Sequence, residues 1–315
     1  MAEDIRGALL RASKPPTKEL FSTLITANHI LHHHNVVDAF GHISVRNPQN
    51  PNTFFLSRNL APALVKSRSD IIEYRVEDSE PIDPEAPRGF AERFIHSEIY
   101  KKYQDVKSVI HAHNESVLPF SIGSVPLKPV FHMAGAIGPQ IPIYDIQNHY
   151  KSSDPLHSLL ITTSHLGAAL AAGFNPGTTT QKLTGMIKNY ITASTPEPVP
   201  YPPITTVLMR GHGFTCVGTS IEEAVYRAIY TCANARVQMQ ALLLQGTYHV
   251  GLVAERVGGK EGGDARPEGI RYLSERECGD SWKAIGEQAA RPWGLWVEEV
   301  RCRGLYFNEL DQVEA

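Results

Sequence analysis

The chain has 315 residues, 42% of them hydrophobic, which is enough to bury a sizeable core in one large domain. Its 30 basic and 33 acidic residues give a formal charge of -3, so we expect neither nucleic acid nor an anionic membrane as a partner. The N-terminal stretch is unlike a secretory signal peptide, no apolar run is long enough to span a membrane, and the four cysteines show no metal-binding or disulfide spacing. These features predict a cytoplasmic protein.

The first predicted elements are a helix and a β-hairpin. Apolar residues recur at steps of three and four over residues 17–35, which predicts an amphipathic helix packed on a sheet. Apolar and polar side chains alternate over 41–46, and a polar loop leads to a second apolar run at 53–58, so these segments are expected to pair as strands. The helix contains a group of histidines that we expect on a solvated face: His29, His32, His33 and His34.

The next two elements place polar side chains at spacings that matter for chemistry. Residues 90–104 are predicted to be helical, which puts Glu92 and His96, four residues apart, on one face. Residues 105–114 are predicted to form a strand, so that His111 and His113 point to the same side of a sheet. Two imidazoles therefore share one face.

A third histidine lies in a tight turn. The segment 204–210 is predicted to be a strand that enters a Gly-His-Gly bend at 211–213, where the glycines let the backbone approach closely. His212 is thereby free to project from the tip of the bend. A capping-box pattern at 220–223 then starts a long helix, which we expect to end at about Gln245.

The domain organisation is predicted from composition. Residues 1–250 are expected to form one domain, with a proline-rich inserted excursion at 174–203. Residues 251–315 are expected to contain a mobile loop rich in glycine and charge, followed by a helical appendage around Trp282 and Trp296.

The three histidines predict a metal site. By chance alone, 14 histidines among 315 residues would give roughly 0.6 His-x-His pairs, so the pair is weak support by itself. Its placement on a strand, with a third imidazole on a turn, matches a common catalytic set of three imidazoles with an open position. We predict that His111, His113 and His212 bind a divalent metal, zinc before manganese, cobalt or iron. The alternative is that all three are structural polar residues.

An ordered set of motifs resembles the class II aldolase/adducin family over roughly residues 15–250. The motifs are Gly-His-Ile-Ser-Val-Arg at 41–46, Leu-Ser-Arg at 56–58, Glu92 with His96, His-Ala-His at 111–113 and Arg-Gly-His-Gly at 210–213. The resemblance implies an α/β fold of three layers, α/β/α, around a central mixed, mostly antiparallel sheet. It also implies a homo-oligomer, with a tetramer favoured, in which Glu92 is the catalytic acid/base.

The sequence departs from the sugar-phosphate aldolases of this family in its substrate positions. Those enzymes carry two serines before the catalytic glutamate and an asparagine in the first glycine-rich turn. Here Phe90 and Ala91 precede Glu92, and His42 takes the place of the asparagine. We therefore expect a substrate without a phosphate group, with His42 among its contacts.

Further candidate substrate residues are Ser57, Arg58 and His132. A guanidinium at Arg58 could grip a carboxylate through two parallel hydrogen bonds, or it could pair with Asp38 or Asp70 instead. The stretch around His132 resembles a branch that contains aromatic-acid decarboxylases and an iron-dependent oxygenase. His132 is therefore a pocket candidate, with a packing role as the alternative.

These features predict a metal-dependent lyase. We expect decarboxylation, ahead of retro-aldol cleavage, of a small carboxylated, non-phosphorylated substrate through a metal-stabilised enolate. Glu92 would move the proton that the reaction requires. An iron-dependent oxygenase of the same fold is one alternative. A non-catalytic, adducin-like interaction module is another, although such a module has no need to keep three histidines and a glutamate together.

Overall fold

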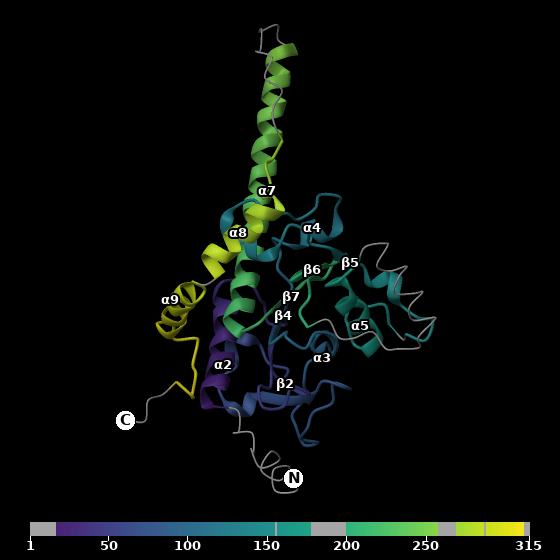
Figure 1. The fold of residues 1–315 in the computed structure, drawn as a ribbon, viewed down its shortest axis with the longest axis vertical. Helices are drawn as coiled ribbons and strands as arrows, with labels where there is room; N and C mark the ends of the chain where they lie inside the picture. The colour runs from purple at the N-terminus through teal and green to yellow at the C-terminus, as the bar shows by residue number, and fades with distance from the viewer. Residues whose placement is uncertain (1–16, 155, 178–199, 258–268, 287, 312–315) are drawn as a thin grey trace, which may run out of the picture.

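The protein is built around a seven-stranded sheet (Figure 1). The computed structural model describes residues 17–154, 156–177, 200–257, 269–286 and 288–311. The strands lie in the order β3-β2-β1-β4-β7-β6-β5, and the described neighbours are antiparallel except for β5 with β6. Their bounds are β1 (His42–Arg46), β2 (Thr53–Ser57), β3 (Ile71–Arg75), β4 (Ser108–Ala112), β5 (Ile143–Tyr144), β6 (Thr206–Met209) and β7 (Gly213–Gly218).

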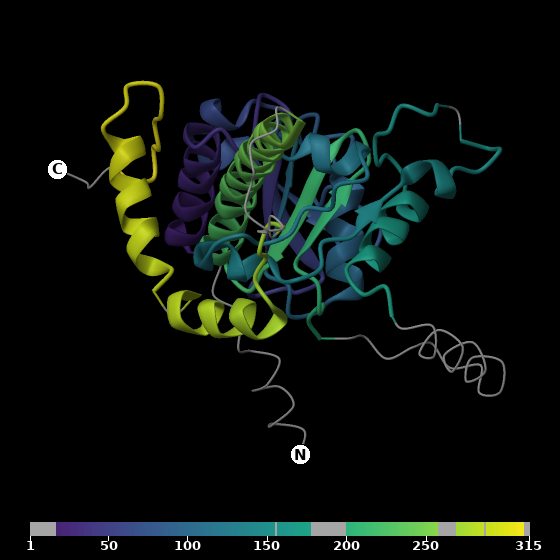
Figure 2. The same ribbon diagram turned by 90° about the horizontal axis from the view of Figure 1, so that it is seen from above.

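Helices cover both faces of this sheet. The α-helices are α2 (Lys18–His33), α3 (Arg93–Lys102), α4 (Leu118–Ile122), α5 (Ser164–Gly173), α7 (Ile221–Val257), α8 (Glu275–Gly286) and α9 (Ala290–Arg301). Short 3-10 helices are η1 (Pro62–Leu64), η2 (Arg68–Asp70), η3 (His132–Ile137) and η4 (Ile146–His149). Figure 2 shows α2 and α7 on one side of the sheet and α5 on the other.

Alternation along the strands creates two buried cores. Ile43 and Ile110 belong to the core under α2 and α7, whereas Val109 and Val217 belong to the core under α3 and α5. Because side chains alternate along a strand, His111 lies on the same side as Val109. The predicted three-layer fold with a mixed, mostly antiparallel sheet is confirmed, and so are the first helix, the hairpin and the helix after Glu92.

The long helix α7 begins where the capping pattern predicts, but it ends later. The Glu223 amide donates to Ser220 Oγ over 3.1 Å, as expected for a helix start. The predicted end near Gln245 is wrong, because α7 continues to Val257 and projects beyond the rest of the molecule in Figure 1. The prediction followed the buried stripe, which fades past Leu242, whereas the helical backbone continues with mostly exposed side chains over residues 243–251.

The prediction of a solvated histidine face on α2 is wrong for His29. Its side chain is 2% exposed, and Nε2 lies 2.6 Å from the Val65 carbonyl oxygen. Burial lowers the pKa of His29 to about 4. The ring of Tyr306 stacks on His29 with centroids 5.2 Å apart, so the C-terminal segment covers this part of the helix.

The C-terminal helices form as predicted around Trp282 and Trp296. They also pack on the main body, because Trp296 is buried in the core under α2 and α7, and the Asn308 side chain donates to the Ser22 carbonyl over 3.0 Å. The predicted boundary after residue 250 falls inside α7, and the domain division stays a prediction. Most of the predicted excursion and of the predicted mobile loop lie outside the described residues. No helix in the described ranges is both long and apolar enough to cross a membrane.

Candidate metal centre

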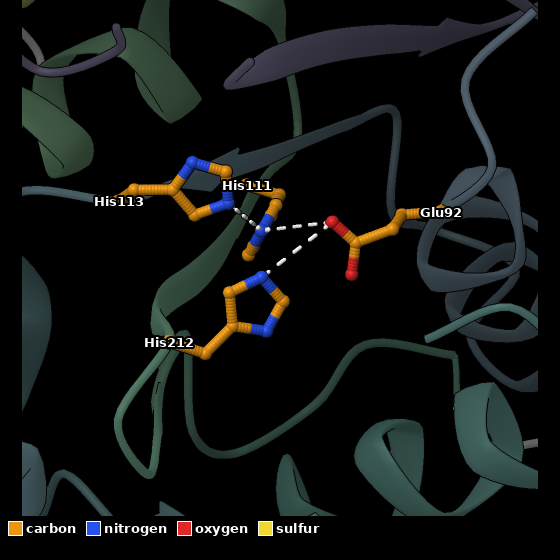
Figure 3. A group of neighbouring side chains, drawn as sticks. All are labelled: Glu92, His111, His113 and His212. Atoms are coloured by element: carbon orange, nitrogen blue, oxygen red, sulfur yellow. Dashed lines mark hydrogen bonds and ion pairs between the residues drawn. The ribbon is translucent and has the colours of Figure 1, made fainter. Parts of the chain in front are cut away.

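Four side chains that are distant in sequence converge at one end of the sheet. Glu92, His111, His113 and His212 each present one ligand atom, and these atoms lie within 4.8 Å of one another. His111 Nε2 lies 2.9 Å from His113 Nε2, while Glu92 Oε2 lies 3.7 Å from His111 Nε2 and 3.5 Å from His212 Nε2. Figure 3 shows the four groups pointing toward one another.

The sheet and a glycine turn position the three imidazoles. His111 sits near the end of β4, paired with Thr215 of β7, and His113 follows two residues later. His212 occupies the bend between β6 and β7, where Gly211 has a φ of 64° and Gly213 a φ of 153°. A Cβ at Gly213 would overlap the Ala112 backbone, so only glycine brings β7 back beside β4 this tightly.

Hydrogen bonds leave ligand nitrogens facing one another. Nδ1–H of His111 donates to the Phe214 carbonyl over 3.2 Å, and Nδ1–H of His113 donates to Asp38 Oδ1 over 3.4 Å. In these tautomers both Nε2 atoms present lone pairs at 2.9 Å, a repulsive arrangement that a bound cation relieves. Both ring nitrogens of His212 are buried without a hydrogen-bond partner among the described residues. The residues present therefore fit a divalent metal ion.

Electrostatics keep His111 and His113 in the form that binds metal. Burial, strengthened by the neighbouring imidazoles, holds the pKa of His111 well below its usual value. The pKa of His113 is lowered chiefly by burial, with Asp38 acting in the opposite direction. Neutral imidazole is the form that ligates a metal, so the pocket favours binding near neutral pH.

Glu92 has one oxygen fixed and one oxygen directed at the histidines. It lies directly before the first residue of α3, and its side chain is 8% exposed. Oε1 accepts a hydrogen bond from the Ile161 amide over 2.9 Å. Oε2 faces the imidazoles, so this carboxylate can either bind a metal or exchange a proton beside one.

A buried hydrogen-bonded chain starts next to the centre. His42 pairs with His111 across β1 and β4, and its Nδ1 lies 2.7 Å from His96 Nε2. His96 Nδ1 lies 2.6 Å from Ser44 Oγ, which lies 2.7 Å from the Tyr100 hydroxyl. Burial lowers the pKa of His96 to about 3, so the chain is neutral. Neither His96 nor Ser44 was assigned a role from sequence, although strand alternation puts Ser44 and His42 on one face.

The other predicted substrate residues occupy different surroundings. Arg58 Nε donates to Asp70 Oδ1 over 2.8 Å, which is one of the two pairings considered, and the arginine side chain is 40% exposed. Strand alternation places Ser57 on the opposite face of the sheet from Glu92, and its hydroxyl is buried. His132 is exposed on η3 and is not among the converging groups. Substrate roles for these three residues stay predictions.

Asp38 is a contact that sequence reasoning missed. It was considered as a partner for Arg58, but its carboxylate instead meets His113 and also accepts from the Gly41 amide over 2.9 Å. A hollow of about 620 Å³ opens beside these two residues, and Asn114 and Arg236 line it as well. Of the four converging residues, His113 lines this hollow.

The chain is an α/β/α protein with a mostly antiparallel sheet, and three imidazoles and a carboxylate form a candidate metal site at one sheet end. Residues 22–239 match the model of the class II aldolase and adducin N-terminal domain. The chain belongs to this family.

Individual relatives agree with the family assignment. Decarboxylase tropJ of Talaromyces stipitatus is 43% identical over 286 residues, covering 91% of this chain and 96% of the relative. A 3,4-dihydroxyphthalate decarboxylase of a Terrabacter species is 26% identical over 149 residues, covering 46% and 47%. The solved L-fuculose 1-phosphate aldolase of Glaciozyma antarctica superposes with a TM-score of 0.62 at 19% identity, covering 94% of this chain and 98% of that one. The relatives support a lyase, and the solved structure supports the fold.

Proposed function

We propose that the chain is a metal-dependent carbon–carbon lyase that decarboxylates a small carboxylated, non-phosphorylated substrate. The observation that carries this proposal is the convergence of Glu92 Oε2 with three imidazoles at one end of the sheet. The 43% identical relative named as a decarboxylase favours decarboxylation over retro-aldol cleavage, which is the second candidate reaction.

His111, His113 and His212 would hold the ion, with zinc as the first choice and manganese, cobalt or iron as alternatives. A bound divalent ion would supply a Lewis acid that draws electron density from a chelating substrate oxygen. In the reaction, the bond to the carboxyl carbon breaks, carbon dioxide leaves and the electron pair stays on the substrate carbon. That carbon must then take up a proton.

Glu92 is suited to deliver this proton. Because the Ile161 amide holds Oε1, the carboxyl group cannot turn freely, and Oε2 stays on the side of the histidines. A positioned acid of this kind is worth about 10²- to 10⁴-fold in rate. Glu92 would therefore act as the catalytic acid/base.

The surroundings of the centre support a carboxylate rather than a phosphate ester. Phe90 stands where the sugar-phosphate aldolases carry a serine, and its ring lies against His42 with centroids 4.6 Å apart. This side of the pocket therefore presents an aromatic wall and an imidazole. Arg58, held by Asp70 but partly exposed, would add a positive charge for a substrate carboxylate.

We further propose a cytoplasmic homo-oligomer, with a tetramer favoured. All four cysteines are free, as is usual in a reducing compartment. The projecting part of α7 exposes large apolar side chains, which an oligomer would cover: Leu243, Leu244, Tyr248 and Val250. Size measurement in solution tests the assembly.

The test of function combines metal analysis with product detection. Elemental analysis should find at least one ion per chain, and a variant with His111, His113 and His212 replaced by alanine should bind one ion fewer than the wild type. Carbon dioxide release should appear with aromatic or β-keto acids and not with a sugar phosphate. The oxygenase would be established instead if the ferrous protein consumed dioxygen and released no carbon dioxide when dioxygen was absent. A folded protein that binds no metal would favour an interaction module.

A further inference from the structure

A second group of ligand-type side chains lies where the C-terminal helix α9 meets the first helix. His33 is the last residue of α2, His34 caps that helix, and Glu299 projects from α9. Each residue offers one ligand atom, and the three atoms lie within 4.8 Å of one another. This group shares no residue with the centre around Glu92.

We propose that His33, His34 and Glu299 bind a second divalent transition-metal ion, with zinc as the best fit. Zinc takes imidazole nitrogens and carboxylate oxygens at about 2.0–2.2 Å, and tetrahedral geometry then places the ligand atoms about 3.4 Å apart. Glu299 Oε2 lies 3.1 Å from His34 Nε2 and 4.0 Å from His33 Nε2. The observed separations bracket the tetrahedral value, so an ion fits with only small side-chain adjustment.

Two of the proposed ligand atoms lack any other partner. His34 Nε2 and Glu299 Oε2 are both buried, and neither makes a hydrogen bond within the described part of the chain. Within the described residues their ion-pair partners belong to the group itself, because the two atoms lie 3.1 Å apart and Glu299 Oε2 also faces His33. Buried polar atoms normally have partners, and an ion between these two would serve as a partner to both.

The site is more open than the centre around Glu92. The side chains of His33, His34 and Glu299 are 20%, 23% and 35% exposed, which leaves room for a water or another ligand in the fourth position. Arg236, which lines the same hollow as His34, places a positive charge nearby. With more exposed ligands and a nearby cation, this site should fill after the main centre as metal is added.

An ion here would link helix α9 to the C-terminal end of helix α2. The Trp296 ring of α9 already packs against His34, with centroids 5.4 Å apart, so the two helices are in register for such a link. His34 and His113 line the same hollow of about 620 Å³. An ion at the second site would therefore stabilise one wall of the hollow that His113 of the main centre also lines.

The experiment is a cobalt titration of the full chain after treatment with a chelator, because cobalt(II) reports its ligands by visible absorption. In the His111, His113 and His212 triple alanine variant, we expect about one ion per chain from the second site alone. Adding Glu299→Ala should weaken this binding about tenfold or more, since the loss of even an outer-shell contact costs 10- to 100-fold. Zinc should raise the melting temperature of the triple variant, and Glu299→Ala should remove that rise.

The matched control is Glu298→Ala, because Glu298 is the adjacent acid on α9 but binds Arg301 at the surface. It should leave the second ion in place. If the triple variant does not fold, the wild-type protein is titrated instead. It should bind a second equivalent of cobalt, and Glu299→Ala should remove that second equivalent. No second equivalent in wild type, or one that survives both His34→Ala and Glu299→Ala, would overturn the proposal. Since neither readout involves turnover, the result is independent of the proposed lyase activity.

Discussion

Replacing Glu92 by glutamine tests whether its free oxygen acts as an acid. The substitution preserves shape and keeps an oxygen able to accept from the Ile161 amide, now 2.9 Å from Oε1. It exchanges Oε2, which lies 3.5 Å from His212 Nε2, for a group that cannot deliver the proton. We expect the variant to fold and to retain its metal through the three histidines.

The expected loss in kcat is about 10²- to 10⁴-fold, which corresponds to roughly 3–5 kcal/mol in the activation barrier. The assay is carbon dioxide release at saturating substrate, with metal content measured on the same samples. Glu98→Gln is a matched control, because Glu98 is a buried acid on the same helix that pairs with Lys101. Unchanged turnover in Glu92→Gln would remove the carboxylate from the mechanism, and a loss of metal would make it a ligand instead.

Three further substitutions test the support of the site and of the fold. Asp38→Asn weakens the hydrogen bond that orients His113, so metal affinity should fall about 10- to 100-fold, as measured by competition with a chelator. The pKa of His29 is about 4 in the folded protein and 6.5 for an ordinary histidine, so the free energy of unfolding is unaffected by this group above pH 6.5 and decreases as the pH falls from 6.5 toward 4. His29→Gln should remove about 2 kcal/mol of the stability difference between pH 7 and pH 5 in urea unfolding, and an unchanged difference would contradict this assignment. Gly213→Ala forces a Cβ into the Ala112 backbone and should destabilise the protein by about 2 kcal/mol or more, which thermal unfolding would show.

Short-range patterns in the sequence predict a large part of the fold and of the site. A His-x-His pair on a strand necessarily places both rings on one side, and a Gly-His-Gly bend projects the third ring. Strand β4 and the turn at His212 follow these rules, and the structure brings Glu92 to the same point. What made the convergence predictable is that each local rule fixes the direction of a side chain.

Contacts between distant segments could not be predicted in the same way. The hydrogen bonds of His113 with Asp38, of His42 with His96 and of Glu92 with Ile161 depend on strand order and on loop paths. The local spacing of residues determines neither the strand order nor the loop paths. Arg58 illustrates this, because the sequence offers two acidic partners and only the pairing of β2 with β3, which sets Ser57 opposite Ile71, selects Asp70.

The histidines of α2 also show that contacts between distant segments cannot be predicted from local patterns. The spacing of apolar residues identifies the face of the helix that packs on the sheet, and the opposite face was assigned to solvent by default. That face is instead covered by α9 and the segment after it, which begin more than 250 residues later in the chain. Helix α9 places Glu299 against His33 and His34. Three side chains that could bind a metal therefore meet on a surface that the helix pattern assigns to water.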